Sequence, residues 1–308
     1  MAPPRYTLRQ LAYFVAVADT GSVSAAATRL HVSPTAVSAA MTQLEKVLRT
    51  QLMVRRKAHG VSLTPAGTYL YSRAQGLLQE AEELELSVAS GGQVLRGPLV
   101  IGCYVTVAAT VVPPLMEGFA AEHPQVDLSF VTGTQDEIPL RLLDGELDLA
   151  VVYDMDLPEG LHMRVLFETA AYVLLPAGHR LADAPEVALA DLAADPMILL
   201  DAPPSSRHTM TLFDRDRVTP HVAHRTTDYE LTRSLVARGF GYAILVQRPA
   251  GDLSFEGLPV VARPIVPAVP PVQVLIVWAQ GTRLTDRARA MIAYAPQVRF
   301  PRIEDPAP

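Results

Sequence analysis

The chain has 308 residues, of which 49% are hydrophobic and 6% are aromatic. This length exceeds an average single domain, so we expect two or three domains with substantial cores. Cys103 is the only cysteine, which excludes an intrachain disulfide framework and fits a reducing cytoplasm. The N-terminus has no apolar signal region, and no apolar run is long enough to span a membrane. The sequence therefore predicts a cytoplasmic protein without membrane contact.

The net charge of −6 hides an uneven distribution. Residues 1–79 hold nine Lys and Arg residues and two acids, a local charge of +7, whereas the remainder carries −13. A basic segment joined to an acidic body is typical of a nucleic-acid-binding module attached to another domain. A chance cluster of surface charges is the alternative interpretation.

Three helices are predicted near the N-terminus, over residues 7–18, 22–30 and 33–48, because apolar residues recur there at helical spacing. The last two are joined by a tight turn. Ser33 at the N-cap and Pro34 at the first helical position are typical start signals. The outer face of the third helix carries short polar side chains, which can approach bases and phosphates without burying charge. This arrangement predicts a helix-turn-helix.

Residues 49–63 predict two short strands around a basic turn, which together form a β-wing. Arg55, Arg56 and Lys57 are three adjacent cations at this turn and are suited to phosphate contact or to entry into a minor groove. An ordinary solvated loop is the alternative interpretation.

A long helix is predicted from Thr64 to Ser90, and the glycines at 91–92 predict a hinge after it. Leucines repeat in this helix every seven residues, and small or apolar residues follow each of them by four. The two series are Leu70, Leu77 and Leu84, and Ala74, Ala81 and Val88. This heptad seam predicts a dimerising linker helix. A helix that covers its own domain is the alternative.

After Leu95 short apolar strands alternate with helices. Strands are expected at 99–104, 126–131, 147–152, 171–175, 197–200, 221–225, 242–246, 259–263 and 272–278, and helices over 107–122, 138–144, after Ser205, over 229–237 and over 284–294. This alternation predicts two units with parallel sheets and right-handed crossovers. The proline-rich segment 264–271 is expected to cross between the units, and the tail from Phe300 to be disordered.

The order of helix, helix-turn-helix, wing, long helix and two α/β units resembles the LysR-type transcriptional regulators over nearly the whole chain. The residues that carry the resemblance match in spacing and type: 14–18, 22–33, 36–38, Leu44-Glu45, Leu52, Arg55 and 63–67. Residues 239–243 resemble the family's glycine turn before a lobe II strand, and 191–192 and 196–198 match its strand-entry pattern less specifically. The resemblance implies a DNA-binding regulator of transcription that is controlled by a small-molecule effector. The fold that it implies is α/β, with an N-terminal winged helix-turn-helix plus a long linker helix, and then a two-lobed, periplasmic-binding-protein-like α/β effector domain.

The expected domains are the winged helix-turn-helix at 1–64, the dimerising linker helix and hinge at 65–92, and the effector domain at 93–301. Lobe I is expected at about 95–162 and 266–300, and lobe II at about 163–265. The resemblance implies a homodimer and, from the family's paired dimers, a homotetramer. Double-stranded promoter or operator DNA is the expected partner, and RNA polymerase is compatible with the same role.

DNA contacts are expected on the helix-turn-helix and the wing. The resemblance carries them onto Ser33, Thr35, Ser38 and Arg55, while Thr42 is added from its helix face and Arg56 from the wing turn. Four positions depart from the family, which often has Gln at Pro34, Arg at Ala39, Gly at Arg49 and Phe at Met53. The docking mode therefore carries over, but the family's common base contacts do not.

Effector contacts are expected at the carboxyl ends of the parallel strands, where helix N-termini offer N–H groups. The candidate residues are Tyr104, Thr106, Thr132, Thr134, Gln135, Tyr153, Pro203, Ser205, Arg207 and Thr227. Arg207 is the nearest cation and is able to hold a carboxylate bidentately. We therefore expect an anionic effector, an organic acid or an amino acid. The alternative for the hydroxyl residues is an ordinary capping role.

The sequence contains no H-E-x-x-H, G-x-S-x-G, Walker or G-x-G-x-x-G motif, and its eight histidines are scattered. We therefore expect no enzyme activity, catalytic residue, metal or cofactor, and interpret the cluster of Asp154, Asp156 and Glu159 as a solvated loop. Two alternative functions stay open. One is a small-molecule binding protein without DNA-regulated output, and the other is a redox-sensing regulator that acts through Cys103.

Overall fold

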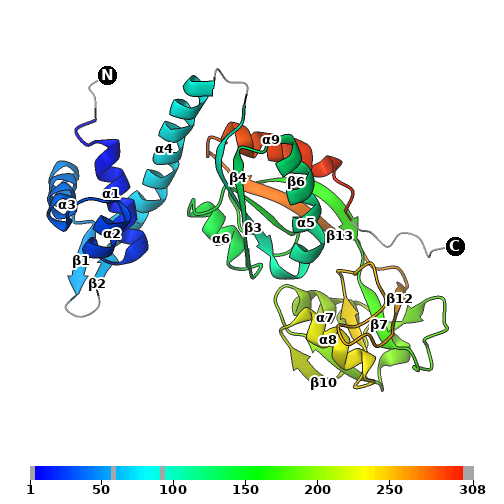
Figure 1. Cartoon of the computed structure of the whole chain (residues 1–308). Coiled ribbons are helices and arrows are strands. Elements are labelled where there is room, and N and C mark those ends of the chain that lie inside the picture. The colour runs from blue at the N-terminus through cyan, green and yellow to red at the C-terminus, as the bar shows by residue number, and fades with distance from the viewer. Residues whose placement is uncertain (1–3, 57–59, 91–93, 301–308) are drawn as a thin grey trace. The chain divides into compact units, whose positions relative to one another are not determined.

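The computed structural model describes residues 4–56, 60–90 and 94–300. The chain divides into two compact units, residues 1–97 with 144–146, and residues 98–143 with 147–308 (Figure 1). Three predicted features lie outside the described residues: the tip of the wing at 57–59, the glycine hinge at 91–92 and the tail at 301–308.

The N-terminal unit has the predicted helix-turn-helix and wing. Its elements are α1 (Leu8–Thr20), α2 (Val23–Arg29), α3 (Pro34–Leu48), β1 (Met53–Arg56), β2 (Gly60–Leu63) and α4 (Pro65–Ser90). Hydroxyl side chains begin the helices as predicted, since Ser22 and Ser33 accept hydrogen bonds from the amides of Ala25 and Ala36. Gly21 ends α1 in the left-handed conformation, with φ of 61°.

The core of this unit collects one apolar stripe from each helix. Phe14, Val37 and Leu44 are fully buried in it, and Ala74 from α4 joins them. The beginning of α4 therefore covers its own domain, which was the alternative interpretation of the heptad pattern. Farther along α4, Leu77 is 40% exposed and does not belong to this core, so the dimerising interpretation of that part of the helix stays a prediction.

Lobe I of the second unit is built on a five-stranded sheet with the strand order β4-β3-β5-β13-β6. Its elements are β3 (Gly97–Tyr104), α5 (Val105–Glu122), β4 (Val126–Gly133), α6 (Ile138–Leu143), β5 (Leu149–Tyr153), β6 (Leu161–Thr169), β13 (Val272–Ala279) and α9 (Asp286–Tyr294). Strands β3 and β5 are parallel, as predicted. Strand β13 is antiparallel to both β5 and β6, so the sheet is mixed rather than parallel.

Alternate residues of β5 point to opposite faces of this sheet. Ala150 and Val152 pack with Ile138 of α6. Helices α5 and α9 pack together where Phe119 meets Tyr294, with ring centroids 5.7 Å apart. All five residues of β5 are buried, so the centre of the sheet is apolar. The loops that follow the strands begin at the ends of this sheet.

Lobe II has a four-stranded sheet with the order β11-β7-β12-β8 and a parallel pair of β9 and β10. Its elements are β7 (Tyr172–Pro176), β8 (Val187–Ala188), β9 (Pro196–Leu200), α7 (Ser205–Arg215), β10 (His221–Thr226), α8 (Tyr229–Ala237), β11 (Ala243–Leu245) and β12 (Val260–Val266). A bridge between Met197 and Tyr242 joins the two sheets. Because β7 is antiparallel to β11 and β12 whereas β9 is parallel to β10 and β12 to β8, lobe II is mixed, and the expectation of a second parallel unit holds for only part of it. Figure 1 shows α7 and α8 beside this sheet.

Two details differ from the sequence-based expectation. Strand β6 belongs to the sheet of lobe I, so the chain crosses to lobe II at residues 170–171 rather than near 163. This strand lies at the sheet edge and exposes four consecutive residues, so it lacks the alternation that marks a strand. Phe300 is not part of a loose tail, because it is 6% exposed and its ring lies 5.1 Å from that of Phe167.

No single helix among the described residues is long and apolar enough to cross a membrane. Helices α1 and α2 pass this test of length and composition only as a pair, and they are bent by 118°.

Candidate DNA-binding and effector sites

The outer face of α3 is the candidate DNA-reading surface. Ser33, Thr35 and Thr42 are exposed on it and Ser38 is half-buried. Two of these hydroxyls are already used within the helix, because Ser33 caps it and Thr42 donates to the carbonyl of Ser38 at 3.1 Å. Thr35 and Ser38 make no side-chain hydrogen bond within the described residues. They are therefore the hydroxyls best placed to bind another molecule.

Glu45 joins the end of α3 to the wing. Its carboxylate accepts hydrogen bonds from the amides of Leu52 and Met53, at 2.7 and 3.2 Å. Arg49, which turns the chain between them, has a left-handed φ of 52°, a conformation that glycine adopts more readily. Glu45 belongs to the stretch that resembles the LysR-type regulators, and the sequence alone indicates no role for it. Its role is to fix the wing relative to the reading helix.

The wing is an antiparallel pair in which Arg55 lies opposite Val61 and Arg56 opposite Gly60. The amide of Val61 donates to the carbonyl of Gly21 at 2.8 Å, which ties the wing to the end of α1. Both arginines therefore lie on a paired strand of the wing, and the opposite strand is hydrogen-bonded to the end of α1.

The candidate effector site is a small cavity of about 10 Å³ in the second unit, to which both lobes contribute. Its lining includes three of the predicted residues, Thr106, Tyr153 and Ser205. The hydroxyls of Tyr104 and Ser205 lie 3.3 Å apart and link lobe I to lobe II. Burial raises the pKa of Tyr153, so its phenol stays protonated at neutral pH.

Two helices begin at this cavity without a capping side chain. Helix α5 begins directly after Tyr104, and α7 begins at Ser205 after Pro204, and neither has a side-chain hydrogen bond to its first amides. Uncapped N-terminal amides and the positive end of the helix dipole favour a negatively charged group. No charged side chain lines the cavity, and its volume of about 10 Å³ is that of about one water molecule, so a carboxylate would fit at these helix starts only after the lobes separate.

Gln135 has a structural role that explains its position. Its side-chain amide donates to the carbonyls of Tyr153 and Met155, at 2.8 and 3.0 Å, and accepts from the amide of Tyr153 at 3.1 Å. The residue is 1% exposed. It therefore holds the end of β5 in place and has little remaining capacity for a ligand.

Arg207 is not available as the free cation that the sequence suggested. Its guanidinium makes two hydrogen bonds to the Asp156 carboxylate, at 2.6 and 3.0 Å, and lies 3.9 Å from Asp136. These carboxylates, Asp156 first, raise the pKa of Arg207 above its ordinary value. A ligand carboxylate at this exposed pair would have to compete with Asp156.

The other predicted effector residues lie away from the cavity lining. Thr134 caps α6 by accepting from the amide of Glu137 at 3.2 Å, which is the alternative role considered for it. Thr132, Pro203 and Thr227 are exposed. Sequence reasoning missed several lining residues that come from lobe II: Leu200, Thr209, Tyr229, Ile244, Leu245, Val246 and Gln247.

Gln247 is the most informative of the residues that sequence reasoning missed. Its side-chain nitrogen donates to the hydroxyl of Thr110 on α5 at 2.5 Å, so it joins lobe II to lobe I. Its backbone carbonyl accepts from the hydroxyls of Tyr172 and Tyr229. The side-chain oxygen of Gln247 is buried and has no partner within the described residues. No motif in the sequence marks this position.

Cys103 is buried beside this site, and its thiol lies 3.7 Å from the carbonyl of Tyr104. Burial raises the pKa of Cys103 to about 12, so the thiol is protonated at neutral pH and a poor nucleophile. This environment is typical of a structural cysteine and does not support the redox-sensing alternative. Within the described residues no group of three or more His, Cys, Asp or Glu side chains is placed to hold a metal ion.

Comparisons with known proteins agree with this arrangement. The family described as "Bacterial regulatory helix-turn-helix protein, lysR family" matches residues 8–68, and the family "LysR substrate binding domain" matches residues 92–299. The HTH-type transcriptional regulator IlvY of Escherichia coli is 32% identical, over 77% of this chain and 81% of its own length.

Solved structures give the same result. HinK, a LysR family transcriptional regulator from Pseudomonas aeruginosa, is 35% identical with a TM-score of 0.64, covering 95% of this chain and 98% of that one. The C-terminal domain of a probable LysR family regulator from Rhodococcus sp. RHA1 is 41% identical with a TM-score of 0.64. It covers 65% of this chain and 99% of that one.

Proposed function

The chain belongs to the LysR family of transcriptional regulators, and from this premise we propose that it binds a two-fold related operator as a dimer under control of a small carboxylate. The carboxylate, an organic acid or an amino acid, binds between the lobes of the effector domain. The single observation that carries the DNA-binding part is the exposed hydroxyl face of α3 within a segment of charge +7.

The proposed DNA contacts divide into two classes. Arg55 and Arg56 on the wing contact phosphates, which supplies affinity for any sequence. Thr35 and Ser38 on α3 contact base edges, which supplies specificity. Because Pro34 and Ala39 provide no long polar side chain, DNA shape contributes to the choice of site. The main role of Ser33 and Thr42 is to stabilise α3, and contact with the DNA backbone is an additional role.

Substitutions on the two surfaces should separate these classes. Arg55→Ala should weaken binding to the chain's own promoter region and to random DNA alike, and flatten the dependence of log affinity on log salt by about one unit. Thr35→Ala and Ser38→Ala should lower promoter affinity roughly tenfold and leave random DNA unaffected. Fluorescence anisotropy at several salt concentrations measures both.

Arg73→Ala, which removes an exposed cation from α4, is the control for the loss of charge alone. If all three test substitutions weakened binding to random DNA equally, the division into phosphate and base contacts would be wrong.

The dimer is proposed from α4, whose heptad seam continues beyond the residues that pack on its own domain. Leu77 and Leu84 are 40% and 66% exposed and lie one heptad apart, so pairing of two copies of α4 through this seam would bury both. Two helices paired through this seam would present two reading helices to a two-fold related site. Sedimentation velocity of the whole chain distinguishes a dimer, and the family's paired dimers, from a monomer.

The effector proposal rests on the uncapped starts of α5 and α7 at one cavity. The lobes would separate to admit a carboxylate and close again around it, with its oxygens toward these helix starts and Thr106, Ser205 and Thr209 as hydroxyl partners. Because Arg207 is paired with Asp156, we assign the anion contact to backbone amides rather than to the Arg207 guanidinium. Lobe closure is then the step that changes the arrangement of the DNA-binding units.

Calorimetry against a panel of small carboxylates and their amides tests this proposal. A binding carboxylate should lose at least tenfold in affinity with Ser205→Val, because the valine removes the hydroxyl at the first turn of α7. Thr132→Ala is the matched control, since this exposed threonine does not line the cavity. An absence of heat and of any thermal shift with every carboxylate would overturn the anionic assignment.

A further inference from the structure

A second and much larger cavity, of about 480 Å³, lies where the chain passes between the lobes. Its walls come from both crossing segments, residues 167–172 and 263–271, and from residues 246–248. The volume is within the range of pockets that bind small organic molecules. It shares Val246 and Gln247 with the lining of the small effector cavity, and its other lining residues are not part of that cavity.

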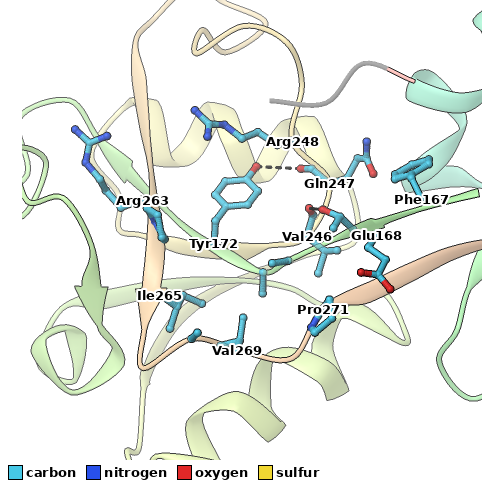
Figure 2. A pocket seen from close by; sticks show the side chains of 15 residues that line it. Phe167, Glu168, Tyr172, Val246, Gln247, Arg248, Arg263, Ile265, Val269 and Pro271 are labelled. Carbon is cyan, nitrogen blue, oxygen red and sulfur yellow. Dashed lines mark hydrogen bonds between the residues drawn. The ribbon is translucent and has the colours of Figure 1, made fainter. Parts of the chain in front are cut away.

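One side of this cavity is cationic. Arg248 and Arg263 line it, and Figure 2 draws both guanidinium groups on the same side of Tyr172. The Arg248 guanidinium lies 6.0 Å from the centre of the Tyr172 ring and donates from Nη2 to the exposed Asp252 carboxylate at 3.3 Å, whereas its Nε is buried without a partner within the described residues. A buried N–H group without an acceptor is costly, so an anionic ligand would gain from pairing with it.

The second arginine is held rigidly. Arg263 donates from Nε to the carbonyl of Ala182 at 2.9 Å and from Nη1 to that of Ala262 at 3.1 Å. Its acceptors are neutral, so its charge is not cancelled there. The one acid of the lining, Glu168, accepts a hydrogen bond from Gln273 at 2.8 Å. The lining thus carries two arginines and one acid, and Asp252, which pairs with Arg248, lies outside it.

The remaining walls are apolar. Figure 2 shows Ile265, Val269 and Pro271 along the side opposite the arginines, and Phe167 and Val246 complete this surface. Phe167 and Ile265 are each 5% exposed, so their positions are fixed by the core. A flat apolar body with one negative end matches these walls in both shape and charge.

We propose that this hinge pocket is a second ligand site, which binds a hydrophobic monocarboxylate such as an aromatic acid, with the carboxylate on Arg248. Gln247 lines both the hinge pocket and the small effector cavity. Its contacts to Thr110, Tyr172 and Tyr229 connect the two sites. A ligand in the hinge pocket would also contact both crossing segments and so bias lobe closure.

Calorimetry of the whole chain with 2-naphthoate as the probe tests this proposal. The wild type should bind 2-naphthoate at least tenfold more tightly than neutral 2-naphthamide, and Arg248→Gln should remove this preference. Arg238→Gln is the matched control, because this exposed lobe II arginine, paired with Glu256, does not line the pocket. Ala268→Trp, which adds bulk to an exposed lining residue, should block the probe.

The outcomes distinguish this site from the effector site. Loss of 2-naphthoate binding in Arg248→Gln and Ala268→Trp, with retention in Ser205→Val, supports the hinge pocket. Loss in Ser205→Val alone would place the probe in the effector cavity and overturn the proposal. Equal affinities for 2-naphthoate and 2-naphthamide would also overturn it.

Discussion

Substitution of Gly67 by alanine should destabilise the DNA-binding unit by about 3 kcal/mol or more and abolish DNA binding. Gly67 lies in the first turn of α4, directly against the backbone of Leu52 before the wing. A Cβ atom at this position would lie 2.0 Å from the Leu52 carbonyl oxygen and 3.0 Å from its carbonyl carbon, so a backbone segment would have to shift. Overpacking against a fixed backbone is among the costlier single substitutions.

Gly76→Ala in the same helix is the matched control. No atom lies within 4 Å of a Cβ placed at Gly76, so alanine should stabilise α4 by about 0.5–1 kcal/mol through its higher helix propensity. Thermal unfolding followed by circular dichroism, together with DNA binding by anisotropy, measures both effects. Equal stability of Gly67→Ala and the wild type would show that α4 and the wing are not packed as described.

Gln135→Leu should lower the free energy of unfolding of the effector domain by roughly 3–5 kcal/mol. The substitution replaces the side-chain amide by methyl groups and leaves three backbone groups without their partners, two buried at Tyr153 and one part-buried at Met155. Each buried polar group that loses its partner costs about 1–3 kcal/mol. The end of β5, which leads into the effector cavity, should loosen as a result.

Urea unfolding can be followed at Trp278, the only tryptophan of the chain, because it lies on β13 in the same sheet as β5. Gln273→Leu, which removes an exposed hydrogen bond on β13, should cost about 0.5 kcal/mol and serves as the control. A Gln135→Leu midpoint within error of the control would contradict the structural role given to Gln135.

Much of the fold could be predicted from the sequence because its signals are local. Ser33 and Pro34 mark the start of α3 within two residues, and α8 over Tyr229–Ala237 follows from its own apolar spacing. The charge of the first 79 residues and the polar face of α3 depend on composition and helical geometry alone. These features require no knowledge of what packs against them.

The candidate site was predicted less completely, for reasons that particular residues make clear. Thr106 and Ser205 were found because they follow strands and begin helices. Gln135 was expected to bind a ligand, but its amide meets the backbone of Tyr153, 18 residues away in the sequence. Arg207 was expected to be free, but Asp156 lies 51 residues before it. No spacing rule indicates such partners.

The sequence by itself determined the order of the elements, the helix starts and the basic reading unit, since caps, periodicity and charge act over a few residues. Only the tertiary structure decided that the sheets are mixed, that β6 belongs to lobe I, and that Gln247 joins the lobes. It also decided which polar groups still have a hydrogen-bond donor or acceptor available for a ligand. The physical reason is that strand pairing, burial and ion pairing are settled by segments that meet only after folding.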